Sequence, residues 1–224
     1  MRETVRFVDK MESLVSRVQL WFSTHKRIDG LWISTWERDP DFLLRRVEEA
    51  LELIKTYDRL RYDRITRDLD RVWARMVFGY AAQYTPAMNA CELDVRFVLA
   101  VASSPAIIAA SIVHEATHAR IMHRGIEYAE PIRARIEAIC VRRELAFAKK
   151  LPNGLELQEL AEGRLERCAT PEFWTNAKFR ERDVEGTIEA ARDAGIPMWI
   201  VRVVFAVARL GAASRRKLRR LPGA

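Results

Sequence analysis

Apolar residues in the first third of the chain recur every three or four positions, the spacing of amphipathic helices. One such set runs from Val8 to Trp21 and predicts a first helix. A second set follows Asp39 and Pro40, where aspartate can cap a helix and proline suits its first turn. We therefore expect a second helix from about that point, with an apolar face formed by Leu43, Val47, Ala50, Leu51 and Ile54.

The pattern changes to alternation between Glu92 and Val101. Apolar and polar residues alternate there with a period close to two, which predicts a strand with one buried face. The stretch from Val72 to Phe78 is the candidate antiparallel partner, joined to it through a loop over residues 80–90. A helical end to that stretch is the alternative.

Two further helices are predicted downstream. Ser103–Pro105 forms a helix start and Gly125 a helix stop. The next helix begins at Pro131 and runs to about Lys150, and residues 154–210 have the pattern of additional helices.

These elements predict an α+β fold that is mostly helical, with a small antiparallel sheet beside the helix over residues 105–125. Residues 1–70 are expected to form a helical segment that packs on a core over residues 71–150. Residues 151–224 form a helical segment with a basic tail, and the three segments together form one compact domain.

The composition describes a globular chain with a real core. Its 224 residues are 49% hydrophobic and 31% charged, which separates it from disordered chains. The net charge of +7 permits acidic substrates, anionic membranes or nucleic acid as partners, but it selects none of them.

The cysteines and the chain's start predict a cytoplasmic protein. Cys91, Cys140 and Cys168 are too few and too scattered for a disulfide framework, so we expect buried, reduced thiols. The first residues carry charges throughout, unlike a secretory signal, and no apolar run reaches about 18 residues.

The candidate chemistry lies in the segment His114-Glu115-Ala116-Thr117-His118. Two histidines four residues apart project from one face of a helix and can bind one ion. Glu115 lies about 100 degrees round the helix axis, from where a carboxylate reaches a metal-bound water without binding the metal. The flanking residues are apolar, so two histidines and a glutamate buried here require a metal or equivalent partners.

A catalytic zinc normally has three protein ligands and one open position. The downstream carboxylates Glu127, Glu130, Glu137 and Glu144 compete for the third place. Glu137 is favoured because it lies inside an apolar stretch of the second helix. Glu144 is an alternative ligand or a partner that orients a ligand, and Glu130 is a weaker alternative.

These residues resemble the zincin superfamily of metallopeptidases, and within it the gluzincin branch. Some members carry this motif followed by eighteen residues and a glutamate ligand, and here residues 119–136 separate His118 from Glu137. The resemblance covers roughly residues 70–150. It implies that the strand over residues 92–101, or its neighbour, borders the cleft and can pair with an extended substrate.

The resemblance implies hydrolysis of peptide or amide bonds in a peptide or protein substrate. Zinc held by His114, His118 and Glu137 would activate a water, with Glu115 as general base. Two features depart from the branch. Val141 stands where some members have an acidic residue that orients a zinc histidine, and no motif assigns the oxyanion donor, for which Tyr128 and His123 are candidates.

Alternatives remain beside this interpretation. Glu137 can instead pair with Arg133 or Arg142 on its own helix. The chain can also be a non-catalytic, zinc-stabilised module that acts through its basic helical ends, with Arg215–Arg220 touching an anionic membrane, a protein or nucleic acid. A third interpretation is a helical nucleic-acid-binding protein whose motif is accidental.

Overall fold

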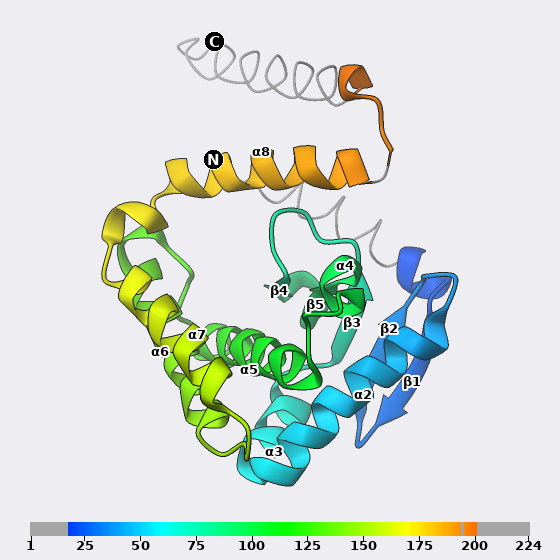
Figure 1. The fold of residues 1–224 in the computed structure, drawn as a ribbon, viewed down its shortest axis with the longest axis vertical. Coiled ribbons are helices and arrows are strands. Elements are labelled where there is room, and N and C mark those ends of the chain that lie inside the picture. Colours follow the sequence, from blue (N-terminus) through cyan, green and yellow to red (C-terminus); the bar gives the residue numbers. More distant parts are fainter. Residues whose placement is uncertain (1–17, 194, 201–224) are drawn as a thin grey trace, which may run out of the picture.

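The computed structural model describes residues 18–193 and 195–200 (Figure 1). The strands are β1 (Thr24–Ile28), β2 (Leu31–Thr35), β3 (Arg71–Arg75), β4 (Ala82–Thr85) and β5 (Ala90–Asp94). The helices are α2 (Pro40–Tyr57), α3 (Arg59–Asp68), α4 (Val95–Leu99), α5 (Pro105–Met122), α6 (Glu130–Ala148), α7 (Leu155–Cys168) and α8 (Asn176–Asp193), with short 3-10 turns η1 (Pro86–Met88) and η2 (Pro171–Trp174). The predicted class, α+β and mostly helical, is confirmed.

The sheet is mixed, not antiparallel as predicted. Its order is β1-β2-β3-β5-β4. The two edge strands, β1 and β4, are antiparallel to their neighbours, whereas β2, β3 and β5 run parallel. The predicted partner stretch does form β3 beside β5, but the chain between them contains β4 and η1 instead of a simple loop. Because that connection is long enough to reverse direction twice, β4 takes the antiparallel place beside β5.

The predicted strand over residues 92–101 ends early. β5 stops at Asp94, and the chain turns directly into α4. The Asp94 carboxylate caps α4 by accepting a hydrogen bond from the backbone N–H of Arg96 at 2.7 Å. Val95 and Val98 are both buried at a spacing of three, which is the helical signal that the apparent alternation concealed.

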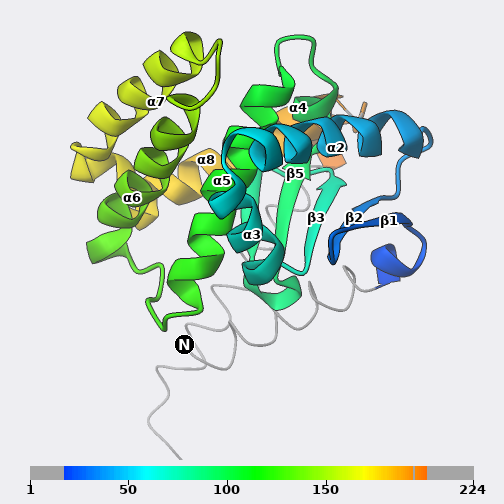
Figure 2. The ribbon, with the colours of Figure 1, turned by 90° about the horizontal axis from the view of Figure 1, so that it is seen from below.

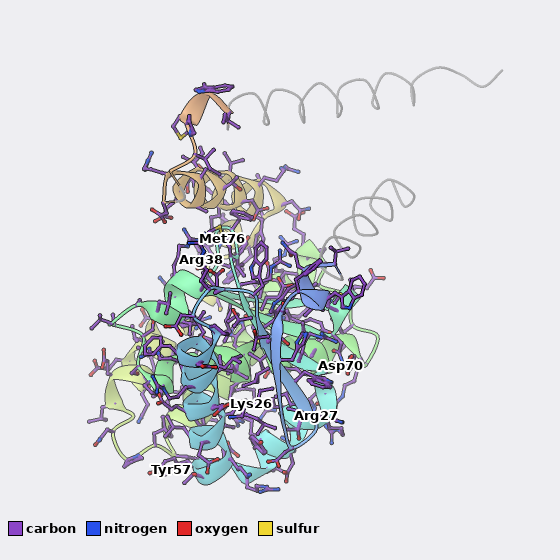
Figure 3. The ribbon with its side chains drawn as sticks, turned by 90° about the vertical axis from the view of Figure 1, so that its right-hand side faces the viewer. Lys26, Arg27, Arg38, Tyr57, Asp70 and Met76 are labelled. Atoms are coloured by element: carbon purple, nitrogen blue, oxygen red, sulfur yellow. The ribbon has the colours of Figure 1, made fainter. Side chains whose placement is uncertain are left out.

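The N-terminal segment is not purely helical. Residues 24–35 form a hairpin through Asp29 and Gly30, which adopt positive φ values of 47° and 92°, and such a pair at a two-residue turn is a hairpin signal. Figure 3 labels Lys26 and Arg27 on the outer strand β1. Because β2 pairs with β3, the sheet joins the predicted first and second segments.

The predicted first helix and the end of the predicted helical region over residues 154–210 lie mainly outside the described residues. Of the helix predicted from Val8 to Trp21, only residues 18–21 are described, and they are helical. Residues 201–210 and the basic run Arg215–Arg220 also lie outside the described residues.

Helices α2, α3 and α5 pack on one face of the sheet (Figure 2). The predicted second helix begins at Pro40, although the Asp39 side chain forms no capping hydrogen bond. All five residues of its predicted apolar face are buried. They form one cluster with alternate residues of the inner strands, including Ile33, Val72 and Leu93. Helix α5 packs on this cluster.

The two predicted helices around the motif are confirmed as α5 and α6. Ser104 caps α5 by accepting a hydrogen bond from the backbone N–H of Ile107, and Gly125 follows its end with a φ of 77°. Helices α7 and α8 fill the predicted helical C-terminal region. Figure 1 shows α8 running across the upper part of the view, above the sheet.

Candidate metal centre

The motif residues lie on the buried part of α5, where the helix packs against both the sheet and α6. His114 is 4% exposed and Glu115 7% exposed, so both are enclosed by protein. Glu137, on α6, is 6% exposed. Burial of these polar groups is costly unless they have partners, and the packing of α5 against α6 supplies partners for His114 and Glu137.

Three residues place potential ligand atoms in a small triangle, in which the two oxygens of the Glu137 carboxylate together form one corner. The two Nε2 atoms of His114 and His118 are 3.1 Å apart. Glu137 places Oε2 at 3.2 Å from His114 Nε2 and Oε1 at 3.2 Å from His118 Nε2. Ligand atoms about 2.0–2.1 Å from a tetrahedral zinc lie roughly 3.3 Å from one another. The donor set and its spacing therefore fit a cation of the size of zinc.

The charges of the triangle are strongly coupled. Burial disfavours the charged imidazolium, but hydrogen bonds to Glu137 and Glu144 outweigh it and raise the pKa of His114 to about 10. Burial likewise opposes ionisation of Glu137, but hydrogen bonds from His114 and His118 hold the pKa of its carboxyl far below the usual value. Metal ligation requires neutral imidazoles, so a bound cation would replace this proton.

Glu144 holds the far side of the His114 ring. Its Oε1 accepts a hydrogen bond from His114 Nδ1, and its Oε2 forms an ion pair with Arg164 Nη1 at 2.6 Å. Because Nδ1 bonds to Glu144, the other ring nitrogen of His114, Nε2, faces His118 and Glu137. Glu144 thus occupies the orienting position that Val141 leaves open, and it lies behind the histidine instead of beside the ligand atoms.

A cysteine also lies close to the histidines. His114, His118 and Cys140 offer ligand atoms that all lie within 4.8 Å of one another, and this group can bind a metal ion. Burial raises the pKa of the Cys140 thiol. The two groups share both histidines and differ in the third ligand. The Glu137 oxygens lie 3.2 Å from the Nε2 atoms of the two histidines, a spacing that matches the separation of ligands in a tetrahedral site.

The other predicted carboxylates are placed elsewhere. Glu127 and Glu130 are exposed, and Glu130 accepts hydrogen bonds from Asn176. Arg133 does not pair with Glu137. It donates to the backbone oxygen of Trp174 at 2.7 Å and to the side chain of Asn176 at 2.8 Å.

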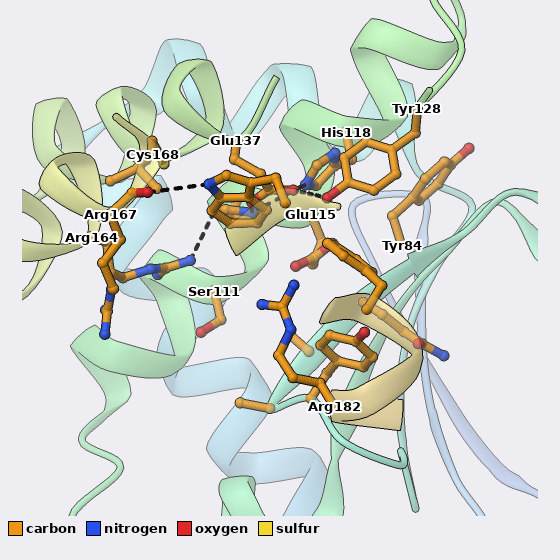
Figure 4. A pocket seen from close by; sticks show the side chains of 18 of the residues that line it. Tyr84, Ser111, Glu115, His118, Tyr128, Glu137, Arg164, Arg167, Cys168 and Arg182 are labelled. Atoms are coloured by element: carbon orange, nitrogen blue, oxygen red, sulfur yellow. Dashed lines mark hydrogen bonds and ion pairs between the residues drawn. The ribbon is translucent and has the colours of Figure 1, made fainter. Parts of the chain in front are cut away.

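Glu115 faces a cavity of about 700 Å³ that also exposes both histidines and Glu137. Within the described residues, no donor forms a hydrogen bond with its carboxylate, which leaves that carboxylate available to a water in the cavity (Figure 4). Tyr128 lines the same cavity, and its hydroxyl donates to Glu137 Oε1. His123, the other predicted candidate for the oxyanion donor, is exposed and does not line the cavity.

Two walls of the cavity come from elements that were not predicted, although the resemblance implied that a neighbour of the strand over residues 92–101 could border the cleft. One is the edge strand β4, which contributes Ala82, Gln83 and Tyr84. The other, which we call the roof, consists of η2 and the first half of α8 and contributes Phe173, Trp174, Phe179 and Arg182. No local pattern marks the roof residues, and their role depends on α8 folding back over α5.

The three cysteines are free and buried, as predicted. Within residues 18–193 and 195–200, no helix is long and apolar enough to cross a lipid bilayer. Comparisons with protein-family models, curated proteins and solved structures found no match. The zincin resemblance therefore rests on the motif, its spacing and the order of the elements around it.

Proposed function

We propose that this chain is a zinc-dependent hydrolase of peptide or amide bonds, and specifically a metallopeptidase. The observation that carries the proposal is the triangle of His114, His118 and the Glu137 carboxylate, with N···N and N···O distances of 3.1–3.2 Å, beside a cavity that Glu115 also lines. A structural zinc site is normally closed by a fourth protein ligand, whereas a catalytic one faces open space. The cavity favours the catalytic kind.

Each residue has a distinct part in the proposed reaction. His114, His118 and Glu137 would hold the zinc, which when bound would supply Lewis-acid polarisation and lower the pKa of its water to about 7. Glu115 accepts a proton from the attacking water as its oxygen bonds to the carbonyl carbon. Glu115 then passes that proton to the amide nitrogen as the C–N bond breaks, giving a carboxylic acid and an amine.

Tyr128 is the group best placed to assist at the carbonyl oxygen. Its ring lies 5.3 Å from that of His118, and its hydroxyl already reaches Glu137. A small rotation redirects the hydroxyl to a developing oxyanion, which is where a preorganised donor stabilises the transition state. The outer edge of β4 would pair with an extended substrate, as the resemblance implies.

The test combines metal analysis with turnover. Wild type is expected to bind one zinc per chain, whereas His118→Ala and Glu137→Ala lose it. Cys140→Ala is the matched control for the third ligand and is expected to keep the zinc. Loss in Cys140→Ala with retention in Glu137→Ala would transfer the ligand role to the cysteine.

Glu115→Gln separates catalysis from metal binding. The substitution keeps the shape of the side chain but removes the base, so we expect zinc to be retained and peptide hydrolysis to fall by about 10²–10⁴-fold. Unchanged hydrolysis would contradict the mechanism. Zinc retention in a protein that hydrolyses no peptide or amide would instead favour the non-catalytic, zinc-stabilised module.

A further inference from the structure

Arg182 is a half-buried cation in the roof, and its hydrogen bonds leave part of its guanidinium unused. Its Nε donates to the backbone oxygen of Lys178 at 3.3 Å and its Nη2 to that of Phe173 at 3.0 Å. Within the described part of the chain, no carboxylate lies within 4.0 Å of it in an ion pair. The remaining nitrogen, Nη1, has two N–H donors that neither carbonyl engages.

Aromatic rings hold the Arg182 guanidinium in place. Its central carbon lies 4.2 Å from the ring centre of Phe173 and 4.3 Å from that of Phe179, with Trp174 at 5.6 Å. Such stacking fixes the plane of the group at little cost and limits its access to water. The result is a preorganised donor fork. Figure 4 shows it directed into the cavity, toward the side on which Glu115 lies.

The other two arginines that line the cavity, Arg164 and Arg167, differ from Arg182 in charge pairing or in exposure to solvent. Arg164 is paired with Glu144, so its charge is neutralised. Arg167 lines the cavity but is exposed to solvent. Arg182 alone combines partial burial, a cavity position and no carboxylate partner within the described residues. A guanidinium in that condition matches a carboxylate, to which it can donate two parallel hydrogen bonds.

We propose that Arg182 binds a carboxylate of the substrate, so that the chain acts on short peptides that present a carboxylate close to the scissile bond. The inference rests on the proposed function and deepens it. The carboxylate is either the free C-terminus of the peptide or the side chain of an acidic residue. The cavity of about 700 Å³ lies within the range of sites that enclose small ligands, which fits a short peptide. Phe173 and Trp174 provide an apolar wall for the neighbouring side chain.

The experiment measures binding, which keeps it separate from turnover. The full chain carrying Glu115→Gln, loaded with zinc, is titrated calorimetrically with three probes. They are N-acetyl-alanyl-phenylalanine, its C-terminal amide, and the amide of N-acetyl-glutamyl-phenylalanine. The free acid is expected to bind roughly 10- to 100-fold more tightly than its amide, as is usual for hydrogen bonds to a charged group. Tight binding of the glutamyl amide would assign the carboxylate to a side chain instead.

Two variants make the test specific. Adding Arg182→Gln should remove the preference for the carboxylate, whereas Arg182→Lys should keep part of it. Arg180→Gln is the matched control, because Arg180 is exposed on the same helix, does not line the cavity and carries the same charge. It should leave the preference intact.

Two results would overturn the inference. One is equal affinity for all three probes before Arg182 is changed. The other is an equal loss of affinity for all probes in Arg182→Gln, which would assign Arg182 to the support of the roof. Failure of the proposed function has a different signature, namely absence of zinc from the wild type or turnover that survives Glu115→Gln.

Discussion

The base and the roof of the cavity satisfy their charges in opposite ways. At the base, on α5 and α6, His114, Glu137 and Glu144 are buried, and both carboxylates are bonded directly to His114. In the roof, Arg182 is stacked on rings and, among the residues that the structure describes, donates to backbone oxygens alone. A network of buried, mutually bonded ions holds its members in one arrangement, whereas stacked cations keep donors available. The base is thus suited to chemistry and the roof to recognition.

Removal of the metal should have the largest effect on stability, and it should act on the base of the cavity more than on the roof. A ligand that binds only the folded state stabilises it by about 4 kcal/mol at a thousandfold excess over its Kd. For a chain of this length, its loss lowers the Tm by roughly 8–16 °C. We expect chelation to produce such a fall and, by hydrogen–deuterium exchange, to increase exchange in α5 and α6 more than in α8.

The apo protein should nevertheless remain folded, because the ion pair between His114 and Glu137 replaces part of the cation's contribution. Zinc added back should restore the original melting curve. Faster exchange in the roof than in α5 and α6 after chelation would show that the metal does not organise the base.

The next effect tests how the roof is attached. Gly186 of α8 lies directly against the backbone at Gly79, and a Cβ at Gly186 would fall 2.0 Å from the Gly79 Cα. Backbone cannot yield as a flexible side chain does, so Gly186→Ala should cost about 2–3 kcal/mol in unfolding free energy or detach α8. Limited proteolysis of residues 171–193 would detect the detachment.

Gly163→Ala on α7 is the matched control for this substitution. A Cβ there meets nothing within 4 Å, so the change should stabilise the chain by up to about 1 kcal/mol through helix propensity. If Gly186→Ala were equally stabilising, the close contact between α8 and the loop at Gly79 would not exist in solution.

The same contrast explains what could be predicted from the sequence. Helices α5 and α6, with His114, Glu115, His118 and Glu137 placed together, follow from local periodicity, capping and spacing. The direction of β3 relative to β5 was predicted wrongly, because residues 80–90, predicted as a loop, contain β4, which forms a short antiparallel hairpin with β5 and so adds one reversal of the chain. The turn at Asp29 and Gly30 was a local hairpin signal that was overlooked.

The roof had no such signal. Phe173, Phe179 and Arg182 follow no motif, and their positions result from α8 docking through contacts between residues about a hundred positions apart. The orienting role of Glu144 was open in the sequence because its helical position allowed either ligation or support. Only the packing of α5 on α6 places it behind the His114 ring.

The smallest effect concerns a single hydrogen bond that connects the roof to the loop before β4. The Tyr80 hydroxyl donates to Asp183 Oδ1 at 2.8 Å, and Tyr80→Phe removes it at a cost of about 1 kcal/mol. Tyr62→Phe is the matched control, because Tyr62 donates to Asp29 at the same 2.8 Å but on the opposite side of the core.

Both variants should lose similar stability in urea. Only Tyr80→Phe should increase hydrogen exchange in α8 and weaken binding of the carboxylate probe, since of the two hydroxyl bonds only that of Tyr80 reaches the helix of Arg182. Equal exchange in α8 for the two variants would mean that the Tyr80–Asp183 hydrogen bond does not help to hold the roof.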